Sequence, residues 1–207
     1  RVSFGVEKEE IDEKDKKLIN YLVKHRHTST LEHCFMTFKF VVPLYVRSQH
    51  HRHRTWSYNE ISRRYTDVDI QFYEPTSFRT QHETNRQASN QDNINPDLRS
   101  YTNSLVPSSP HPADEAIRWH HKSCLDLFNT LLEKGVCREQ ARGVLPQNLY
   151  TTYIGSVNLN NLLKFIALRD HEGAQWEIQQ MARACLTLAQ EHFPHTINSY
   201  RENSQGH

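Results

Sequence analysis

Residues 52–65 read Arg-His-Arg-Thr-Trp-Ser-Tyr-Asn-Glu-Ile-Ser-Arg-Arg-Tyr, a run with many hydrogen-bond donors and little apolar surface. Residues 47–65 contain five arginines and a single carboxylate, Glu60. Guanidinium groups are rigid forks that match phosphate and carboxylate oxygens, so a bound anion would relieve their mutual repulsion. A charge run of this kind is usually a solvated surface. The interleaved Trp56 and Tyr58 favour instead a pocket for a phosphorylated ligand that carries a planar ring.

The composition is typical of one globular domain. The chain has 207 residues and a formal net charge of +1 at pH 7, so no global field draws it to nucleic acid. Its four cysteines form no C-x-x-C pair, which indicates reduced thiols in a cytoplasmic protein. No apolar run approaches the roughly 20 residues that span a bilayer, and no signal peptide is visible. The chain opens at Arg1 in a segment that is already patterned, and we therefore expect further residues upstream.

Before residue 75, hydrophobic periodicity predicts helices and strands in alternation. The expected elements are helices at 12–24 and 44–51 and strands at 34–42 and 69–74. A loop and a short helix are expected across residues 52–65, the arginine-rich stretch. Cys34, Phe38 and Phe40 lie on the face of the first strand that we expect to be buried. Ser29 and Glu32 have capping-box spacing at a helix start, where free amide groups suit a ligand phosphate.

The composition turns polar at about residues 75–112, which predicts a long loop or insertion in the single domain. After it we expect a helix from Pro112 to Gly135, a short helix at 138–144, a strand at 150–157, a helix at 159–168 capped by Asn158, and a last helix at 174–190. The strands are not spaced as βαβ units. The expected fold class is therefore α+β, with a helical core packed against an antiparallel sheet.

The arginine-rich stretch matches every specified position of the signature Arg-His-Arg-x-x-Ser-x-Asn-Glu-x-Ser-x-Arg-Tyr, and in this the chain resembles the flavin-dependent thymidylate synthases. The likeness extends to residues 25–33, 141–146 and 168–178. The resemblance implies an enzyme that makes dTMP from dUMP, with methylenetetrahydrofolate as one-carbon donor and NADPH-reduced FAD as hydride source. It also implies a homotetramer whose active sites lie at subunit interfaces and are shared between chains.

The same resemblance assigns site residues. FAD would be contacted by Ser3, His27, Ser29, Glu32, Arg52, His53, Arg54, Glu60, Asn158, Asn160 and Lys164. The substrate dUMP would be held by Gln49, Arg52, Glu60, Ile61, Ser62, Arg63, Arg64, Arg142 and Arg169. Arg64 and Arg142 would clamp the phosphate. Arg169, the expected catalytic residue, would stabilise negative charge that develops on the uracil ring as its C5 becomes nucleophilic.

Three positions depart from the family pattern. Asn160 and Lys164 stand where Arg and Asn are common, and Gly173 stands where some members have a histidine. Lys164 can still donate to a phosphate, so cofactor binding is expected to survive. No metal site is expected, because the histidines lack H-E-x-x-H spacing and their arginine neighbours repel cations.

Two alternatives stay open at this point. Ser62 could act as a covalent nucleophile, although no sequence feature guarantees a base within hydrogen-bond reach. The chain could also be a non-catalytic phosphate or nucleic-acid binding module, in which the Arg/His-rich stretch grips phosphates and Trp56 and Tyr58 stack on bases. The near-neutral net charge argues against that second function.

Overall fold

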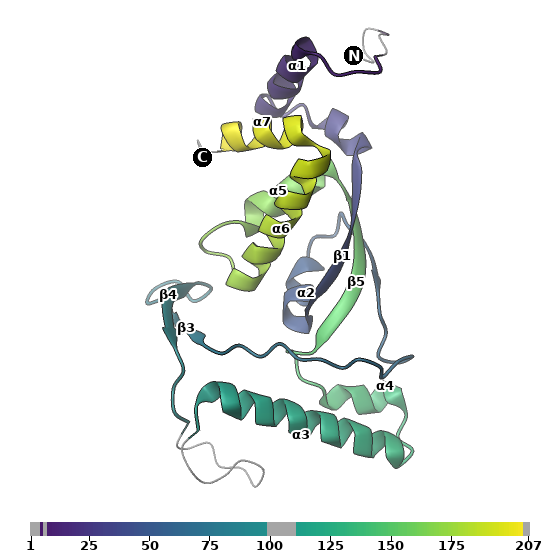
Figure 1. The fold of residues 1–207 in the computed structure, drawn as a ribbon, viewed down its shortest axis with the longest axis vertical. Helices are drawn as coiled ribbons and strands as arrows, with labels where there is room; N and C mark the ends of the chain where they lie inside the picture. The colour runs from purple at the N-terminus through teal and green to yellow at the C-terminus, as the bar shows by residue number, and fades with distance from the viewer. Residues whose placement is uncertain (1–4, 6–7, 99–110, 205–207) are drawn as a thin grey trace.

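A three-stranded antiparallel sheet lies at the centre of the computed structural model, which describes residue 5 and residues 8–98 and 111–204. Its strands are β1 (Phe35–Pro43), β5 (Tyr150–Asn158) and β2 (Ser57–Glu60), in the order β1-β5-β2 (Figure 1). The β1–β5 register runs from Phe35 opposite Asn158 to Pro43 opposite Tyr150. Alternation along β1 buries Phe38 and Phe40 on the inner face, which confirms the predicted strand and its buried side.

Helices cover the inner face of this sheet. They are α2 (Leu44–His50), α5 (Leu159–Arg169) and α6 (Trp176–His192). As predicted, the Asn158 side chain caps α5, where it accepts a hydrogen bond of 2.9 Å from the Asn161 amide. The core between sheet and helices is formed by fully buried side chains such as Tyr153, Leu162, Phe165 and Ile178. This apolar layer holds the end of α2, and therefore the start of the arginine-rich stretch, in a fixed place.

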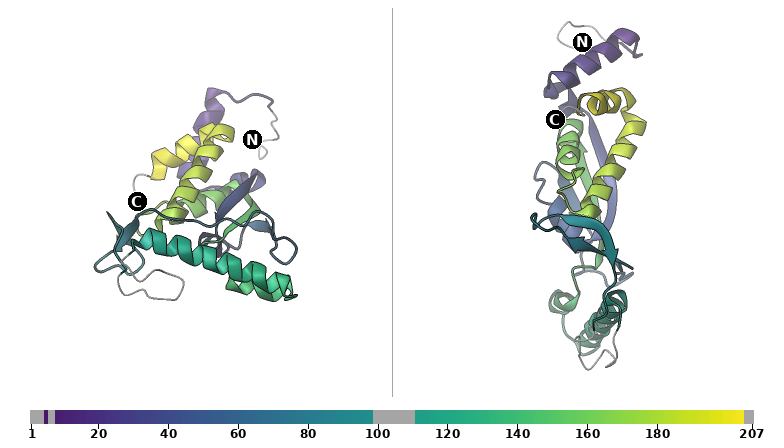
Figure 2. Two further views of the ribbon diagram at one scale, coloured as in Figure 1. Left: turned by 60° about the horizontal axis from the view of Figure 1, so that its bottom comes forward. Right: turned by 90° about the vertical axis from the view of Figure 1, so that its left-hand side faces the viewer.

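The two ends of the molecule are helical. At one end α1 (Glu13–Lys24) packs against α7 (Pro194–Ser204), and at the other lie α3 (Ala113–Glu133) and α4 (Arg138–Ala141), as the right-hand view of Figure 2 shows. The helix α7 was not predicted, because we expected no helix after residue 190. Only Ile197 and Tyr200 give it apolar character, which is too little to produce a periodic signal.

Three local predictions are wrong. Residues 28–33 form the 3-10 helix η2 (Thr28–His33), whose N-cap is His27 and which has no side-chain cap, so Ser29 and Glu32 form no capping box. The arginine-rich stretch contains strand β2 where a loop and short helix were expected. Residues 69–74 form no strand but one isolated bridge, between Phe72 and Leu149.

The polar segment at 75–112 contains more regular structure than its composition indicates. Strands β3 (Phe78–Gln81) and β4 (Ser89–Ile94) pair as an antiparallel hairpin, held partly by Asn90 Nδ2, which donates to the Gln81 carbonyl over 3.1 Å. The chain then reaches α3, which is followed at Gly135 by a left-handed backbone of φ +84°. After α4 comes the one-turn helix η3 (Arg142–Val144). Helices packed against antiparallel strands confirm the α+β class. No helix among the described residues combines the length and apolar character needed to cross a membrane.

Candidate active site

A buried histidine anchors the arginine-rich stretch to the core. His50 ends α2 with none of its surface exposed, and its Nδ1 shares a hydrogen bond of 2.8 Å with Oη of Tyr153. Its ring lies against those of Phe40, Trp56 and Phe165 at centroid distances of 4.4–5.0 Å. Burial, helped by nearby positive groups, lowers the pKa of His50 to about 3, so the ring is neutral at physiological pH. It is a packing residue at the base of the site.

A tyrosine fixes the turn that follows. Tyr58 Oη donates to the backbone carbonyls of His50 (2.9 Å) and His53 (3.1 Å), and these two bonds straddle the turn that carries Arg52. Burial raises the pKa of Tyr58, which keeps the phenol a donor over the whole physiological range. Tyr58 occupies a variable position of the signature, so the signature match gave no role for it.

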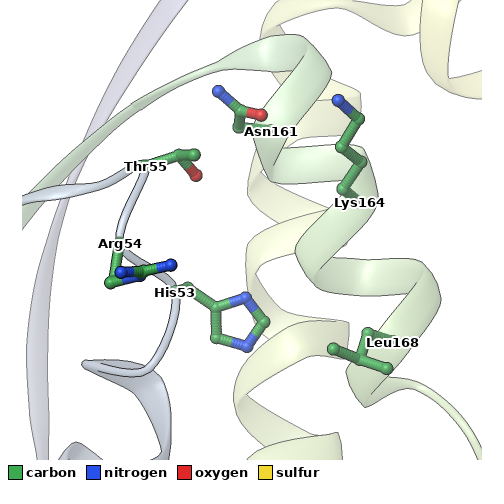
Figure 3. Close-up of a pocket in the computed structure, with 6 residues that line it drawn as sticks. All are labelled: His53, Arg54, Thr55, Asn161, Lys164 and Leu168. Atoms are coloured by element: carbon green, nitrogen blue, oxygen red, sulfur yellow. The ribbon is translucent and has the colours of Figure 1, made fainter.

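The first pocket opens beside this turn, with a volume of about 530 Å³. Its lining residues come from the turn and from α5, and they are His53, Arg54, Thr55, Asn161, Lys164 and Leu168 (Figure 3). Arg54 and Lys164 carry positive charge on its two sides. Three of the residues expected at FAD, namely His53, Arg54 and Lys164, therefore lie together. Thr55 and Asn161 were not predicted, although Asn161 is three residues before Lys164 and so shares its helix face.

His53 is also joined to the expected catalytic residue. Arg169, the last residue of α5, donates from Nε to His53 Nε2 over 3.0 Å. Burial first, and then the charge of Arg169, lowers the pKa of His53 to about 4. Burial also lowers the pKa of Arg169. The imidazole is consequently neutral and accepts at Nε2, while the guanidinium retains its other donors.

The second pocket lies between the end of β2 and η3, and its volume is about 460 Å³. The residues around it include Leu44, Arg47, Glu60, Ile61, Ser62, Arg63, Arg142, Tyr150 and Thr151. Glu60 Oε1 accepts from Arg47 Nε (3.1 Å) and from Thr151 Oγ1 (2.7 Å). Five residues expected at dUMP are thus brought together: Glu60, Ile61, Ser62, Arg63 and Arg142.

The arginines of this pocket differ in their freedom. Arg63 donates to the carbonyls of Val68 (2.6 Å) and Asp69 (3.2 Å), and its Nε is buried without a partner among the described residues. Arg64 does not line the pocket. It is exposed, its contact with Glu139 is long at 3.4 Å, and its guanidinium lies 6.0 Å from the ring centroid of Tyr65. The three arginines that line the pocket and the single carboxylate give it an excess of donors.

The other predicted site residues are dispersed in a single chain. Asn160 Nδ2 donates to Glu32 Oε1 over 3.1 Å, which joins two of the residues expected at FAD. Gln49 Nε2 donates to Oε1 of Gln175. Arg52 is exposed, as are His27 and Ser29 on the side of η2. Asn158 serves as the α5 cap, and Ser3 lies outside the described residues. No group of three or more metal-binding side chains occurs within residue 5 and the ranges 8–98 and 111–204.

The family model for the Thymidylate synthase complementing protein matches residues 1–195. A flavin-dependent thymidylate synthase from Thermus thermophilus is 39% identical over 203 residues, 98% of this chain and 69% of the relative. One from Thermotoga neapolitana is 37% identical over 200 residues, 97% of this chain and 82% of the relative.

Among solved structures, the chain is similar to a UMP/dUMP methylase, PolB from Streptomyces cacaoi, in a crystal structure bound with 5-Br UMP. The TM-score is 0.76 at 27% sequence identity, and the match covers 94% of this chain and 84% of the other. The similarity therefore extends over nearly the whole chain.

Proposed function

The chain belongs to the Thymidylate synthase complementing protein family, the flavin-dependent thymidylate synthases, and from this premise we propose where its ligands bind and how its residues act. The enzyme makes dTMP from dUMP, with methylenetetrahydrofolate as one-carbon donor and NADPH and FAD as the source of hydride. The observation that carries the proposal is that residues of the arginine-rich stretch and of α5 line two pockets rich in donors.

The first pocket suits FAD. Its donor set, with Arg54 and Lys164 on opposite sides and Asn161 beside them, matches the charge of a pyrophosphate. Asn160 and Glu32 lie at the start of α5 and on η2, where their mutual hydrogen bond gives the cofactor site a second edge. His53, Arg54 and Lys164 would hold the cofactor, together with Asn160 and Glu32. When bound, FAD supplies the hydride chemistry, and the protein supplies orientation and charge.

The second pocket suits dUMP. The buried Nε of Arg63 and the guanidinium of Arg142 are donors for a phosphate. Arg64 follows Arg63 in the sequence, and its side chain would leave its weak surface contact with Glu139 to bind the same phosphate. Glu60 uses Oε1 for Arg47 and Thr151, which leaves Oε2 to accept from a sugar hydroxyl. Ser62 lines the same pocket as a hydroxyl donor to the phosphate. A covalent role for it is not favoured, because no base contacts it among the described residues.

Arg169 is the proposed catalytic residue. As negative charge develops on the uracil carbonyls, a fixed guanidinium stabilises it without reorganisation at the moment of reaction. The bond to His53 fixes the orientation of the guanidinium through Nε. Burial of both groups makes the interaction stronger than it would be in water.

We also propose that the site is completed by other copies of the chain in a homotetramer. In one chain the residues expected at dUMP do not all lie together, since Gln49, Arg52, Arg64 and Arg169 lie outside the pocket that contains Glu60 and Arg142. The outer face of the sheet exposes Phe35 (68%), Val41 (57%) and Ile154 (41%), an apolar surface that another copy would cover. Sedimentation of the FAD-loaded protein tests the assembly, and a monomer would contradict it.

The binding proposal is tested by the absorption spectrum of the purified protein. We expect a yellow protein whose flavin spectrum changes on addition of dUMP. Lys164→Glu should lower the FAD content, because it reverses a charge at the first pocket, whereas the matched exposed variant Lys122→Glu on α3 should not. A colourless protein with salt-dependent affinity for nucleic acid would overturn the assignment in favour of a phosphate-binding module.

A further inference from the structure

Four side chains from three elements form one hydrogen-bonded chain beside the proposed active site. Arg79 of β3 binds both oxygens of Glu177, at 2.8 and 3.0 Å, through Nη2. Gln175 Nε2 donates to Glu177 Oε2 over 2.9 Å. Gln49 Nε2 donates in turn to Gln175 Oε1. The polar hairpin is thereby linked through the start of α6 to the last turn of α2.

The order of donors and acceptors in this chain is fixed by its charged end. An arginine can only donate, and an ionised carboxylate can only accept. Glu177 therefore requires Gln175 to turn its NH2 group toward it, which leaves the carbonyl of Gln175 facing Gln49. Gln49 must then present its own NH2 group to Gln175. The Gln49 amide would otherwise be free to flip. Its orientation is set by the Glu177 carboxylate, which acts on it through Gln175.

The charged end is held firmly. The side chain of Glu177 is 12% exposed and that of Arg79 is 25% exposed, so both are sheltered from water. Arg79 also donates from Nε to Ser89 Oγ over 3.0 Å, and its guanidinium lies 5.3 Å from the ring centroid of Trp176. Flipping the amides would place two carbonyl oxygens, or an amide oxygen and the carboxylate, against each other.

The free end of this hydrogen-bonded chain, Gln49, lies in the last turn of α2, directly before the turn that carries Arg52 and His53. The backbone carbonyl of Gln49 accepts from the Arg52 amide over 3.3 Å, one turn before His53 and its partner Arg169. Gln49 Oε1 has no hydrogen-bond partner in the part of the chain that the structure describes. The fixed amide thus offers a carbonyl oxygen and the second hydrogen of Nε2.

We propose that Glu177 and Gln175 are positioning residues that fix the Gln49 amide so that it selects a pyrimidine with a ring N–H, uracil, over one with a ring nitrogen lone pair, cytosine. The inference rests on the proposed function and on the placement of Gln49 at dUMP that the family resemblance implies. A fixed Oε1 accepts from N3–H of uracil, and the remaining N–H donates to an adjacent ring carbonyl. In cytosine N3 is an acceptor and N4 a donor, so cytosine requires the flipped amide, which Glu177 disfavours.

The test compares dUMP with dCMP on the FAD-loaded protein, by the dissociation constants obtained from the ligand-induced change in flavin absorption. The wild-type protein should prefer dUMP by about tenfold to hundredfold, the range expected when a buried acceptor meets an acceptor instead of a donor. In Glu177→Gln an amide replaces the carboxylate. An amide can both donate and accept, so Gln175 and Gln49 can then adopt either amide orientation. The preference should then fall by about tenfold, chiefly because dCMP binds more tightly.

A matched variant separates positioning from stability. Arg79→Gln breaks the same ion pair but keeps the carboxylate, so it should retain the wild-type preference although it loses a comparable amount of stability. Arg183→Gln, which breaks the exposed ion pair with Asp170 elsewhere on α6, should also retain the preference. An unchanged dUMP to dCMP ratio in folded Glu177→Gln would overturn the inference while leaving the proposed function intact. A wild-type protein that binds FAD but neither nucleotide would instead overturn the assignment of the dUMP site.

Discussion

Arg169 Nε donates to His53 Nε2 over 3.0 Å, across 116 residues of sequence. The bond requires a lone pair on His53 Nε2, and the lowering of the His53 pKa to about 4 by burial and by Arg169 supplies it. It connects the proposed FAD pocket, which His53 lines, to the proposed catalytic guanidinium. The residues that we propose for the cofactor and for the substrate are in this way oriented by one shared contact.

The first prediction concerns the guanidinium. Arg169→Ala should leave the protein folded and yellow, because Arg169 is a half-buried residue at a helix end and lies outside the apolar core. Formation of dTMP should fall by about 10²–10³-fold, the usual effect of removing one preorganised donor. Steady-state turnover together with the flavin spectrum measures both. Arg118→Ala, which removes an exposed arginine from α3, is the control. Near-normal turnover in Arg169→Ala would remove it from the mechanism.

The second prediction concerns pH. Folding lowers the pKa of His50 from its ordinary value of 6.5 to about 3, so between these values the unfolded chain binds the extra proton. Stability from this group is therefore complete above pH about 6.5 and is lost as the pH falls toward 3, with a slope of about 1.4 kcal/mol per pH unit. His53 acts in the same direction down to about pH 4.

Urea denaturation between pH 7 and pH 4.5 measures this slope. His50→Asn keeps a polar group near Tyr153 Oη but cannot titrate, so its stability should depend less steeply on pH by about one proton. His192→Asn, at the end of α6 and exposed, should keep the wild-type slope. Equal slopes in wild type and His50→Asn would show that His50 is not the group responsible.

The parts of the fold that follow local rules could be predicted from the sequence. Alternation in β1, the Asn158 cap and the stop at Gly135 each depend on residues a few positions apart. The helix α7 and the β3–β4 hairpin could not, because few of their side chains are apolar and contacts to distant elements, such as Arg79 with Glu177, hold the hairpin in place. Tertiary contacts there outweigh weak local preferences.

The candidate site shows the same division. The signature identified residues of both pockets, because these residues are close together in the sequence. It could not show that the residues divide between two pockets, that Arg169 is bonded to His53, or that Gln175 faces Gln49. Those pairs are more than 100 residues apart, and periodicity carries no information about them.

The third prediction tests the phosphate assignment. Arg64 is exposed and its contact with Glu139 is long, so that surface pair contributes little stability. Arg64→Lys should therefore leave folding unchanged but weaken dUMP binding by about tenfold, through loss of the bidentate fork. The dissociation constant from dUMP titration measures it. Arg138→Lys, in an exposed ion pair with Asp67, is the control. An unchanged dUMP dissociation constant in Arg64→Lys would contradict the assignment.

The fourth prediction tests the packing beneath the site. A Cβ on Gly155 would lie 2.9 Å from Phe40 Cε2 and 3.2 Å from Trp56 Cε3, and both rings are buried. Gly155→Ala should lower the free energy of unfolding by about 1–3 kcal/mol through overpacking. Gly143→Ala meets no atom within 4 Å and should change stability little. Chemical denaturation of both variants measures the difference, and equal stabilities would mean that the rings can move aside.

The fifth prediction tests the turn that carries Arg52, His53 and Arg54. Tyr58→Phe keeps the ring in the aromatic cluster but removes the hydroxyl that donates to the carbonyls of His50 and His53. We expect a loss of about 1–2 kcal/mol of stability and weaker retention of FAD, because the turn loses the side-chain donor that bonds to its backbone carbonyls. Tyr45→Phe also removes a phenol from a partly buried ring, but one whose hydroxyl is not a donor to this turn, and it should retain the cofactor. Equilibrium dialysis against free FAD gives both dissociation constants. If Tyr58→Phe lost stability but held FAD as tightly as Tyr45→Phe, the hydroxyl would have a structural role alone, and the cofactor site would be fixed by α5 rather than by the turn.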